Sequence, residues 1–387
     1  MNMNQVKISE LAIQIRGVSY KPTDIHDSLD GDSVILLRAN NISDGKINFD
    51  DIVYVDKKKV SNEQYLRKGD VLICASSGSK QLVGKAATVN FDIECTFGAF
   101  CKVVRPKKDI ADYLGAYFQS PIYQREITRV AIGANINNIR NEHIDNLGIN
   151  LYSDKENCRI VQKINTIQNV IDNRKKALNI FDDLIKARFV EMFGDVTLNT
   201  KNYPVLSLSD IAEYWNGLTY KPEDVSDEGT IVLRSSNIQN AQLDFEDTVR
   251  VKCKIGDKKY VKENDILMCS RNGSARLVGK VALIREINES MSFGAFMMII
   301  RSNYYPYLMT YFQLPAFRAQ ITTGATTTIN QITGNMLNKV SLPLPDMSVI
   351  NQFAEFVKEV DKSKVVVQKA LDEAQTLFDS LMQQYFG

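Results

Sequence analysis

The chain contains two copies of one sequence pattern, and this repeat limits the folds that it can adopt. Short blocks occur twice in the same order. The block Tyr-Lys-Pro begins at Tyr20 and again at Tyr220, and Phe-Gly-Ala-Phe begins at Phe97 and again at Phe293. The distance between matching positions drifts from 200 residues near the first block to 193 residues near Ile136. Because a repeat of this kind encodes a structural unit, the sequence predicts two similar folded halves joined by loops of unequal length.

Within each copy, the first part has the pattern of a mixed α/β domain. Short apolar runs that end in polar or glycine-rich turns are typical of strands, and they occur at 34–37, 71–74, 99–104 and 295–300. They are followed by apolar residues at helical spacing, from Ile110 to Phe118 in the first copy and from Tyr304 to Phe312 in the second. Each of these stripes predicts a helix with one buried face.

Each copy ends in a long apolar seam. Its apolar residues follow alternating steps of three and four, from Ile160 to Ile185 and from Phe353 to Tyr385, with one polar gap each at Arg174 and Lys364. Such heptads predict a coiled coil. The expected fold is α+β: two similar mixed α/β domains separated by two long helices that form an antiparallel intramolecular coiled coil, with pseudo-twofold symmetry. An alternative is that each helix packs only on its own domain.

Composition excludes several classes of protein. The 387 residues suffice for two to three domains, and the net charge of +1 predicts no general affinity for polyanions, although it allows one basic face. None of the six cysteines forms a C-x-x-C pair, so we expect no metal site. There is no signal peptide, and no apolar run is long enough to cross a bilayer, so we expect a cytoplasmic protein without membrane contact.

Two glycine–lysine loops resemble phosphate-binding loops but depart from that motif. A Walker A loop has four residues between its glycines and a hydroxyl after its lysine. Here five residues separate Gly78 from Gly84, and Ala86 stands where the hydroxyl should be. The second loop repeats both departures, with Val281 after its lysine. The loops therefore argue against an ATP-binding enzyme, which is kept as an alternative.

Polar residues that suit contacts with DNA recur in both copies, and Arg, Asn, Gln, Ser and Thr are the usual readers of bases and phosphates. They follow strands, fill the glycine–lysine loops, or lie in the polar tracts after Gly133 and Gly324. Turns also use many of these residue types. The candidates of the first copy are Tyr20, Lys21, Arg38, Asn40, Asn41, Ser76, Ser77, Ser79, Lys80, Gln81, Lys85, Asn135 and Asn137. Those of the second copy are Tyr220, Lys221, Arg234, Asn237, Arg271, Asn272, Ser274, Arg276, Lys280, Thr327 and Asn330.

These features together resemble the specificity subunit of type I restriction–modification systems. The resemblance covers the whole chain. It rests on the two-copy layout, the Leu-Arg-x-x-Asn-Ile block, the strand at 70–74, the glycine–lysine loop, and the Leu-Pro-Leu-Pro exit at 342–345 before a long helix. The first copy departs from this pattern because it has no prolines at 149–152, which leaves the start of the first long helix open.

The resemblance implies two target recognition domains, each of which reads one half of a split DNA site. The implied boundaries are 1–152 and 195–346 for these domains, and 153–194 and 347–387 for spacer helices that set the unread gap and dock methyltransferase subunits. The implied partners are double-stranded DNA, two methyltransferase subunits and restriction/translocase subunits. The chain itself would be a non-catalytic recognition subunit without a cofactor, in a complex whose other subunits use S-adenosylmethionine, ATP and Mg²⁺. A further alternative is a scaffold protein whose helices pair between chains.

Overall fold

The computed structural model of the chain describes residues 4–78, 82–107, 109–131, 137–322 and 330–387. The chain divides into two compact units. Unit 1 consists of Met1–Lys176 with Val367–Gly387, and unit 2 consists of Ala177–Val366. Each unit therefore contains one copy of the repeat and half of each long helix.

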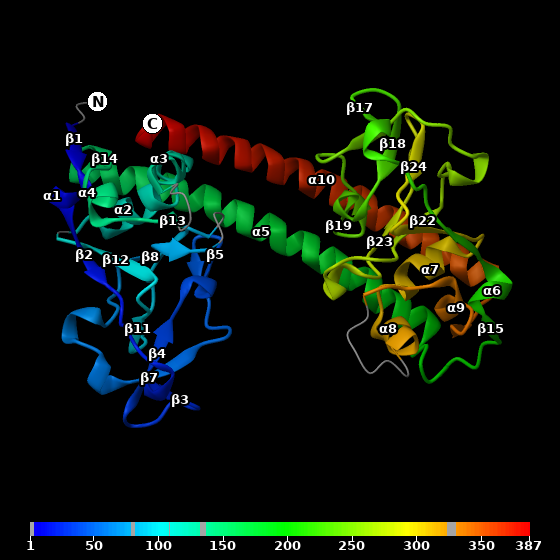
Figure 1. The fold of residues 1–387 in the computed structure, drawn as a ribbon, viewed down its shortest axis with the longest axis horizontal. Coiled ribbons are helices and arrows are strands. Elements are labelled where there is room, and N and C mark those ends of the chain that lie inside the picture. Colours follow the sequence, from blue (N-terminus) through cyan, green and yellow to red (C-terminus); the bar gives the residue numbers. More distant parts are fainter. Residues whose placement is uncertain (1–3, 79–81, 108, 132–136, 323–329) are drawn as a thin grey trace. The chain divides into compact units, whose positions relative to one another are not determined.

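In its described residues, unit 1 has two four-stranded sheets (Figure 1). The first is antiparallel, has the order β10-β8-β12-β2, and consists of β2 (Ala12–Arg16), β8 (Val71–Cys74), β10 (Ala86–Thr88) and β12 (Cys101–Pro106). The second has the order β11-β4-β7-β3 and consists of β3 (Ile25–His26), β4 (Ser33–Leu37), β7 (Val53–Asp56) and β11 (Cys95–Phe97), with β11 parallel to β4. Three smaller ladders pair β1 (Asn4–Lys7) with β14 (Gly148–Leu151), β5 (Ile42–Ser43) with β6 (Lys46–Ile47), and β9 (Ser76–Ser77) with β13 (Asn137–Asn138).

Unit 2 repeats both four-stranded sheets and two of the three smaller ladders. Its antiparallel sheet has the order β16-β25-β22-β23 and consists of β16 (Glu213–Asn216), β22 (Ile266–Cys269), β23 (Val281–Leu283) and β25 (Met297–Arg301). Its second sheet has the order β17-β21-β18-β24 and consists of β17 (Val225–Ser226), β18 (Thr230–Leu233), β21 (Val249–Val251) and β24 (Met291–Phe293), with β24 parallel to β18. Two smaller ladders pair β15 (Val205–Ser207) with β26 (Ser341–Pro343), and β19 (Ile238–Gln239) with β20 (Gln242–Leu243). The repeat read from the sequence is thus a repeat of the fold.

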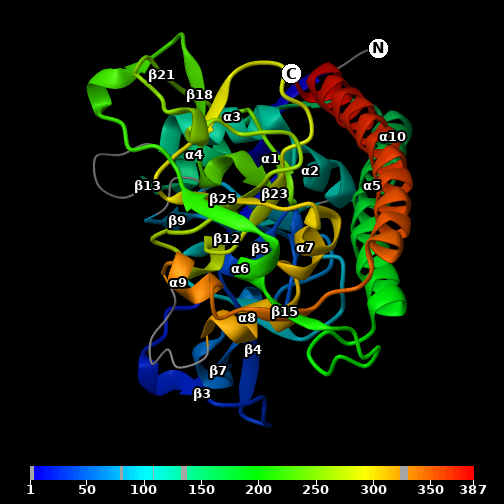
Figure 2. The ribbon, with the colours of Figure 1, turned by 90° about the vertical axis from the view of Figure 1, so that its right-hand side faces the viewer.

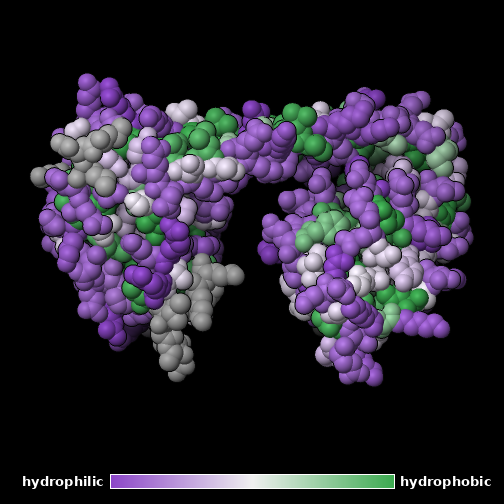
Figure 3. Space-filling model, turned by 90° about the horizontal axis from the view of Figure 1, so that it is seen from above, coloured by the Kyte–Doolittle hydropathy of each residue, from purple (hydrophilic) through white to green (hydrophobic). Residues whose placement is uncertain are grey.

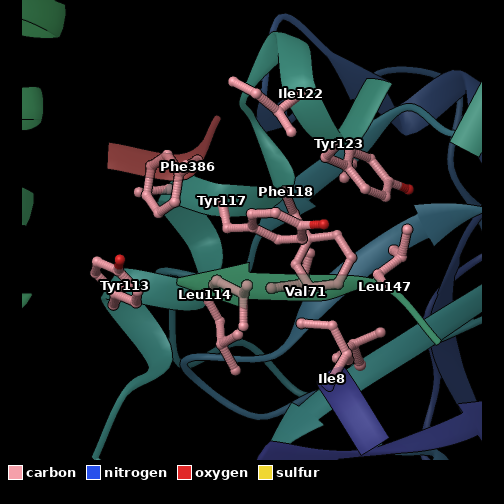
Figure 4. Packing of buried hydrophobic residues seen from close by; sticks show 14 of the residues in the cluster. Ile8, Val71, Tyr113, Leu114, Tyr117, Phe118, Ile122, Tyr123, Leu147 and Phe386 are labelled. Carbon is pink, nitrogen blue, oxygen red and sulfur yellow. The ribbon is translucent and has the colours of Figure 1, made fainter. Parts of the chain in front are cut away.

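Short helices cover one face of each antiparallel sheet. Unit 1 has α1 (Ile8–Leu11), α2 (Ala111–Phe118), α3 (Pro121–Ala131) and α4 (Asn141–Asp145), and unit 2 has α6 (Leu208–Ile211), α7 (Tyr305–Tyr311), α8 (Pro315–Thr322) and α9 (Gly334–Leu337). The predicted apolar stripes lie on α2 and α7, and their members Tyr113, Tyr117 and Tyr307 are fully buried. Figure 4 shows Tyr117 and Phe118 beside Tyr123 of α3 in the core of unit 1.

The two long helices are α5 (Asp154–Phe193) and α10 (Met347–Phe386), each of 40 residues. In unit 1, the start of α5 meets the end of α10, where the rings of Tyr152 and Tyr385 lie 6.5 Å apart. In unit 2, the end of α5 meets the start of α10, where the rings of Phe189 and Phe353 lie 5.6 Å apart. The helices are therefore antiparallel within one chain, as predicted, and the ribbons lie side by side in both views (Figures 1 and 2).

The last turn of each long helix also packs on a short helix of the other copy of the repeat. The alternative that each helix packs only on its own domain is therefore wrong. Phe386 of α10 contacts Tyr113 of α2 at 5.2 Å between ring centroids, and Phe193 of α5 contacts Tyr307 of α7 at 5.0 Å. The polar gap at Lys364 has a partner, because its ammonium group forms an ion pair with Asp182 of α5. Among the described residues, no helix combines the length and the apolar character that a membrane span requires.

Candidate nucleic-acid interface

A close crossing of two backbone segments builds the frame of the candidate site in each unit. The segment that directly follows β2 forms an isolated bridge with the Phe-Gly-Ala-Phe turn, where Val18 pairs with Gly98, and Leu218 pairs with Gly294 in unit 2. A Cβ atom on Gly17 would lie only 2.1 Å from the carbonyl oxygen of Gly98, and one on Gly217 would lie 2.1 Å from the carbonyl oxygen of Phe293. Glycine is thus required at these two places so that the Tyr-Lys-Pro segment can lie against the turn.

The same turn also holds the glycine–lysine loop. The carbonyl oxygen of Phe100 accepts hydrogen bonds from the backbone N–H groups of Ala75 and Ser76, at 2.8 and 3.0 Å. In unit 2, the carbonyl oxygen of Phe296 accepts the equivalent bonds from Ser270 and Arg271, at 2.9 and 3.1 Å. The loop therefore begins beside the second phenylalanine of the turn in both units.

The polar tract at the end of each repeat joins the same place. In unit 1, β13 pairs with β9, so that Asn137 lies opposite Ser77 and Asn138 opposite Ser76. In unit 2, Arg271 bridges Gln331, and the N–H of Asn272 donates to the carbonyl oxygen of Asn330 at 3.2 Å. The fold thus brings together two polar segments that are about 60 residues apart in each copy. The sequence had indicated each of them as a separate candidate.

An arginine held by an aspartate lies at the corresponding position of each unit. Nη2 of Arg38 lies 2.9 Å from a carboxylate oxygen of Asp51, and Nη2 of Arg234 lies 2.8 Å from a carboxylate oxygen of Asp247. Both arginines are about one third exposed, at 34% and 35% of the side chain. In both, Nε is buried without a hydrogen-bond partner among the described residues.

In unit 2 these elements surround a hollow of about 920 Å³. Its lining includes Tyr220, Arg234, Arg271, Asn272 and Asn330 from the predicted set, together with Asp247 and Phe296. The guanidinium carbon of Arg271 lies 5.3 Å from the centroid of the Phe296 ring, a distance typical of a cation–π contact. We call this hollow the unit 2 groove. Five described residues of the predicted set of unit 2 are not among those that line it: Lys221, Asn237, Ser274, Arg276 and Lys280.

Two of the predicted contacts are wrong. Asn41 and Asn237 are fully buried, and their side chains are used within the fold. The side-chain oxygen of Asn41 accepts a bond from the N–H of Arg38 at 2.9 Å, and its amide group donates to the carbonyl oxygen of Asp50 at 2.7 Å. Asn237 makes the equivalent bonds with Arg234 and Asp244, both at 2.8 Å. These asparagines shape the turn that presents the arginine, and neither side chain is accessible to DNA.

The other predicted residues have varied surroundings. Tyr20 is half-buried against the apolar cluster of Val18, Val34, Leu36 and Val55, whereas Lys21 is exposed. Lys221 is exposed and forms an ion pair with Glu223 at 3.2 Å. Asn40 is exposed, and its amide group donates to the carboxylate of Asp51 at 2.9 Å. Lys85 and Lys280 are half-buried, and Ser274 and Arg276 are exposed. Ser79, Lys80, Gln81, Asn135 and Thr327 lie outside the described residues.

The glycine–lysine loops do not have the geometry of a phosphate-binding loop. In such a loop, the glycine-rich turn leads from a strand into a helix. Here each loop connects neighbouring antiparallel strands, β8 with β10 and β22 with β23. The cysteines that precede the loops are buried, as expected, and burial raises the pKa of the Cys74 thiol to about 11 and also raises that of Cys269. The geometry of these loops therefore does not support nucleotide binding.

The sequence analysis missed four residues of the interface, namely Asp51, Asp247, Phe100 and Phe296. A signal for the phenylalanines was present, because they end a block that occurs in both copies. The aspartates also occur at equivalent positions, 13 residues after each arginine. A spacing of 13 residues does not by itself predict a contact, because the aspartate reaches the arginine only across a turn of the folded chain.

Comparison with known proteins identifies the family to which this fold and this surface belong. The model of the family described as the type I restriction modification DNA specificity domain matches residues 3–180 and again residues 200–374. The chain belongs to the type I specificity family. Both matched segments of this type I specificity chain contain one arginine–aspartate pair and one Phe-Gly-Ala-Phe turn.

Individual relatives agree with this assignment. The specificity subunit of the type I restriction enzyme EcoKI from Escherichia coli (strain K12) is 30% identical over 378 residues, which cover 92% of this chain and 80% of the relative. The specificity subunit of the type I restriction enzyme StySPI from Salmonella potsdam is 28% identical and covers 98% of this chain and 87% of the relative. The crystal structure of the type I S subunit from M. genitalium matches 100% of this chain and 96% of that chain with a TM-score of 0.55. At 13% identity, this last match supports the fold of the type I specificity chain.

Proposed function

We propose that this chain recognises a split site on double-stranded DNA, with residues 1–152 and 195–346 as the two recognition domains. Residues 153–194 and 347–387 would be the spacer helices that set the unread gap. The observation that carries the proposal is the repetition of one polar surface: an aspartate-held arginine, an exposed phenylalanine and a polar loop occur in each unit. A chain with two similar reading surfaces suits a target with two separated half-sites.

The chemistry of this surface suits DNA. An arginine fork can bond the O6 and N7 atoms of guanine, and asparagine can bond adenine, through the major groove. Exposed lysines and backbone N–H groups of the loops can contact phosphates, which fix the position of the protein without reading sequence. Because the side chains of the loops differ between the units, with Ser76 in unit 1 where unit 2 has Arg271, the two half-sites would differ in sequence.

The proposed partners follow from the names of the relatives, which are specificity subunits of type I restriction enzymes. We assign this chain to a cytoplasmic complex with two methyltransferase subunits and with restriction/translocase subunits. Those subunits would bind S-adenosylmethionine, ATP and Mg²⁺ and would methylate adenine or cleave DNA. This chain would supply recognition without catalysis.

Mapping of methylated adenines in the host genome, followed by binding assays, tests the proposal. We expect one split sequence, with two fixed half-sites and a constant unread gap, and protection of the same sequence by the purified complex. The control is a complex in which both Arg38 and Arg234 are changed to alanine, for which the protection should be lost. Equal affinity of the unaltered complex for that sequence and for a random duplex at moderate salt would refute the proposed function.

A further inference from the structure

Phe100 and Phe296 are exposed although the residues on either side of them in the sheets are buried. Phe100 is 72% exposed and Phe296 59% exposed, whereas Phe97, Cys101, Phe293 and Met297 are at most 1% exposed. An exposed phenylalanine does not contribute the folding free energy that burial of its side chain would provide. The loss occurs at the same position of both units, at the end of the same four-residue block.

The backbone fixes both rings in place. The N–H of Cys101 donates to the carbonyl oxygen of Gly98 at 2.8 Å, and the N–H of Met297 donates to that of Gly294 at 2.8 Å, so a closed turn carries each ring. The carbonyl oxygen of each phenylalanine accepts two further N–H groups from the start of the glycine–lysine loop. Because the backbone under each ring is already ordered, binding a target restricts only the rotamers of the ring.

The surroundings of Phe296 are cationic and polar. The ring lies in the lining of the unit 2 groove with Arg234 and Arg271, and the Arg271 guanidinium lies over it. A purely apolar partner would leave Arg271, which has no ion pair among the described residues, without a counter-charge, whereas DNA offers both phosphates and apolar base surfaces. On the face drawn in Figure 3, the surface is mainly hydrophilic with separate hydrophobic patches.

We propose that Phe100 and Phe296 contact the apolar surface of DNA bases, one ring in each half-site. The inference rests on the proposed function and adds the kind of contact that the rings make. DNA offers an aromatic ring two apolar surfaces: the C5-methyl group of thymine in the major groove, and the face of a base at a step that the protein unstacks. In unit 1, Ser76 stands where unit 2 has Arg271, so the bare Phe100 ring is the more accessible of the two.

The test uses the full complex with the variants Phe100→Ala and Phe296→Ala, and a duplex that carries the methylated split site. Each variant should lower affinity about 5- to 150-fold, as is usual for loss of an aromatic–base contact. The effect should be confined to the half-site of its own unit, so that the other half-site is an internal control. Phe245→Ala removes another exposed ring of unit 2, which lies outside the unit 2 groove, and should leave affinity unchanged.

Two further experiments distinguish which apolar surface of the bases the ring contacts. If the ring covers a thymine methyl, replacement of that thymine by uracil weakens binding of the unaltered complex but has no further effect on the alanine variant. If the ring enters a base step, 2-aminopurine at that step fluoresces more strongly when the unaltered complex binds, and this increase is absent with the alanine variant. Either result supports the inference.

The inference is overturned if both alanine variants bind the cognate duplex with an affinity within twofold of that of the unaltered complex. In that case each base substitution would also change the affinity of the variants and of the unaltered complex by the same factor. Phe296→Leu, which keeps an apolar side chain, should retain part of the affinity, and thermal unfolding should show that all variants fold. A failure of the proposed function is seen separately, because the unaltered complex would then show no preference for any split sequence.

Discussion

The arginine–aspartate pairs owe their importance to orientation and not to stability. Both arginines are one third exposed and both aspartates are well exposed, and such ion pairs contribute about 0–1 kcal/mol to folding. The aspartate occupies one terminal nitrogen of the fork and fixes the direction of the guanidinium plane. The buried Nε that has no partner in the described residues shows that internal bonds do not satisfy the fork.

Replacement of the aspartate that holds the arginine should therefore change the affinity for random DNA and the discrimination between bases in opposite directions. In Asp247→Ala, affinity for random DNA should rise slightly because a negative charge near the phosphates is lost. Discrimination against a wrong base in the half-site of unit 2 should fall by about 1–2 kcal/mol, since an ordered arginine contact with guanine is worth about 1–3 kcal/mol. Competition binding at fixed salt measures both quantities. Asp51→Ala is the matched control and should affect only the half-site of unit 1; a uniform change at both half-sites would contradict the positioning role.

A second aspartate in each unit, Asp70 or Asp265, has a structural role, and its replacement should reduce stability. Asp70 is 1% exposed and accepts two bonds from Arg105, from Nε at 2.8 Å and from Nη2 at 2.7 Å. Asp70→Ala would leave the buried guanidinium without its counter-charge, which typically costs about 3–5 kcal/mol of folding free energy. In unit 2 the equivalent Arg301 is 31% exposed, so Asp265→Ala should cost less. Chemical denaturation followed by circular dichroism compares the two variants, and equal losses would refute this explanation.

At the residue scale, the sequence indicated which residue types form the candidate site more readily than which individual residues belong to it. Arg38 and Arg234 were predicted as polar residues after a strand, and their side chains are about one third exposed. Asn40 and Asn41 looked alike in the sequence, yet one is exposed and the other fully buried. The difference arises because both residues lie in a 3-10 helix, Ala39–Asn41, which turns successive side chains by about 120°. No local pattern indicates which of the two side chains faces the core.

At the level of secondary structure elements, the periodic patterns were the most reliable evidence. The helical stripes predicted α2 and α7, and the heptads predicted α5 and α10. The start of α5 could not be predicted, because no proline marks it, and the structure places it at Asp154. Nor could the partners of the helix ends be predicted, since Phe189 and Phe193 are apolar residues of the same kind as those of the coiled-coil seam. Only the fold shows that they pack against Tyr307.

The continuity of both long helices predicts how the unread gap is set. If one heptad is deleted from the middle of each helix, the helices shorten by about 10 Å and their faces stay aligned, because seven residues are close to two turns. We expect the gap to shorten by up to about three base pairs, at about 3.4 Å each, while both half-sites stay the same. Methylation mapping of a strain that carries the double deletion measures the gap.

The control for this experiment is deletion of one heptad from α5 alone. It moves the register of the antiparallel pair, including the ion pair of Lys364 with Asp182, so recognition of either split site should be lost. An unchanged gap in the double deletion would show that the helices do not set the spacing.

At the scale of the whole molecule, the ends of the two long helices have equivalent roles. In unit 1, Phe386 at the end of α10 packs on Tyr113 of α2. In unit 2, Phe193 at the end of α5 packs on Tyr307 of α7. The two phenylalanines are 193 residues apart and the two tyrosines 194, so the repeat relates one contact to the other. Each copy of the repeat therefore completes the core of the other copy.

This exchange predicts that residues 1–194 form a symmetric dimer. The fragment lacks α10, which leaves Tyr113 uncovered, but it keeps Phe189 and Phe193 at the end of α5. Two fragments can cover each other's exposed core by a self-complementary contact of the kind that twofold dimers use. Light scattering should give twice the mass of the fragment, and the dimer should dissociate at lower concentration when Phe189 and Phe193 are changed to alanine. Residues 1–176, which lack the second half of α5, should remain monomeric. A fragment of residues 1–194 that stays monomeric at every concentration would show that the two helix ends are not interchangeable.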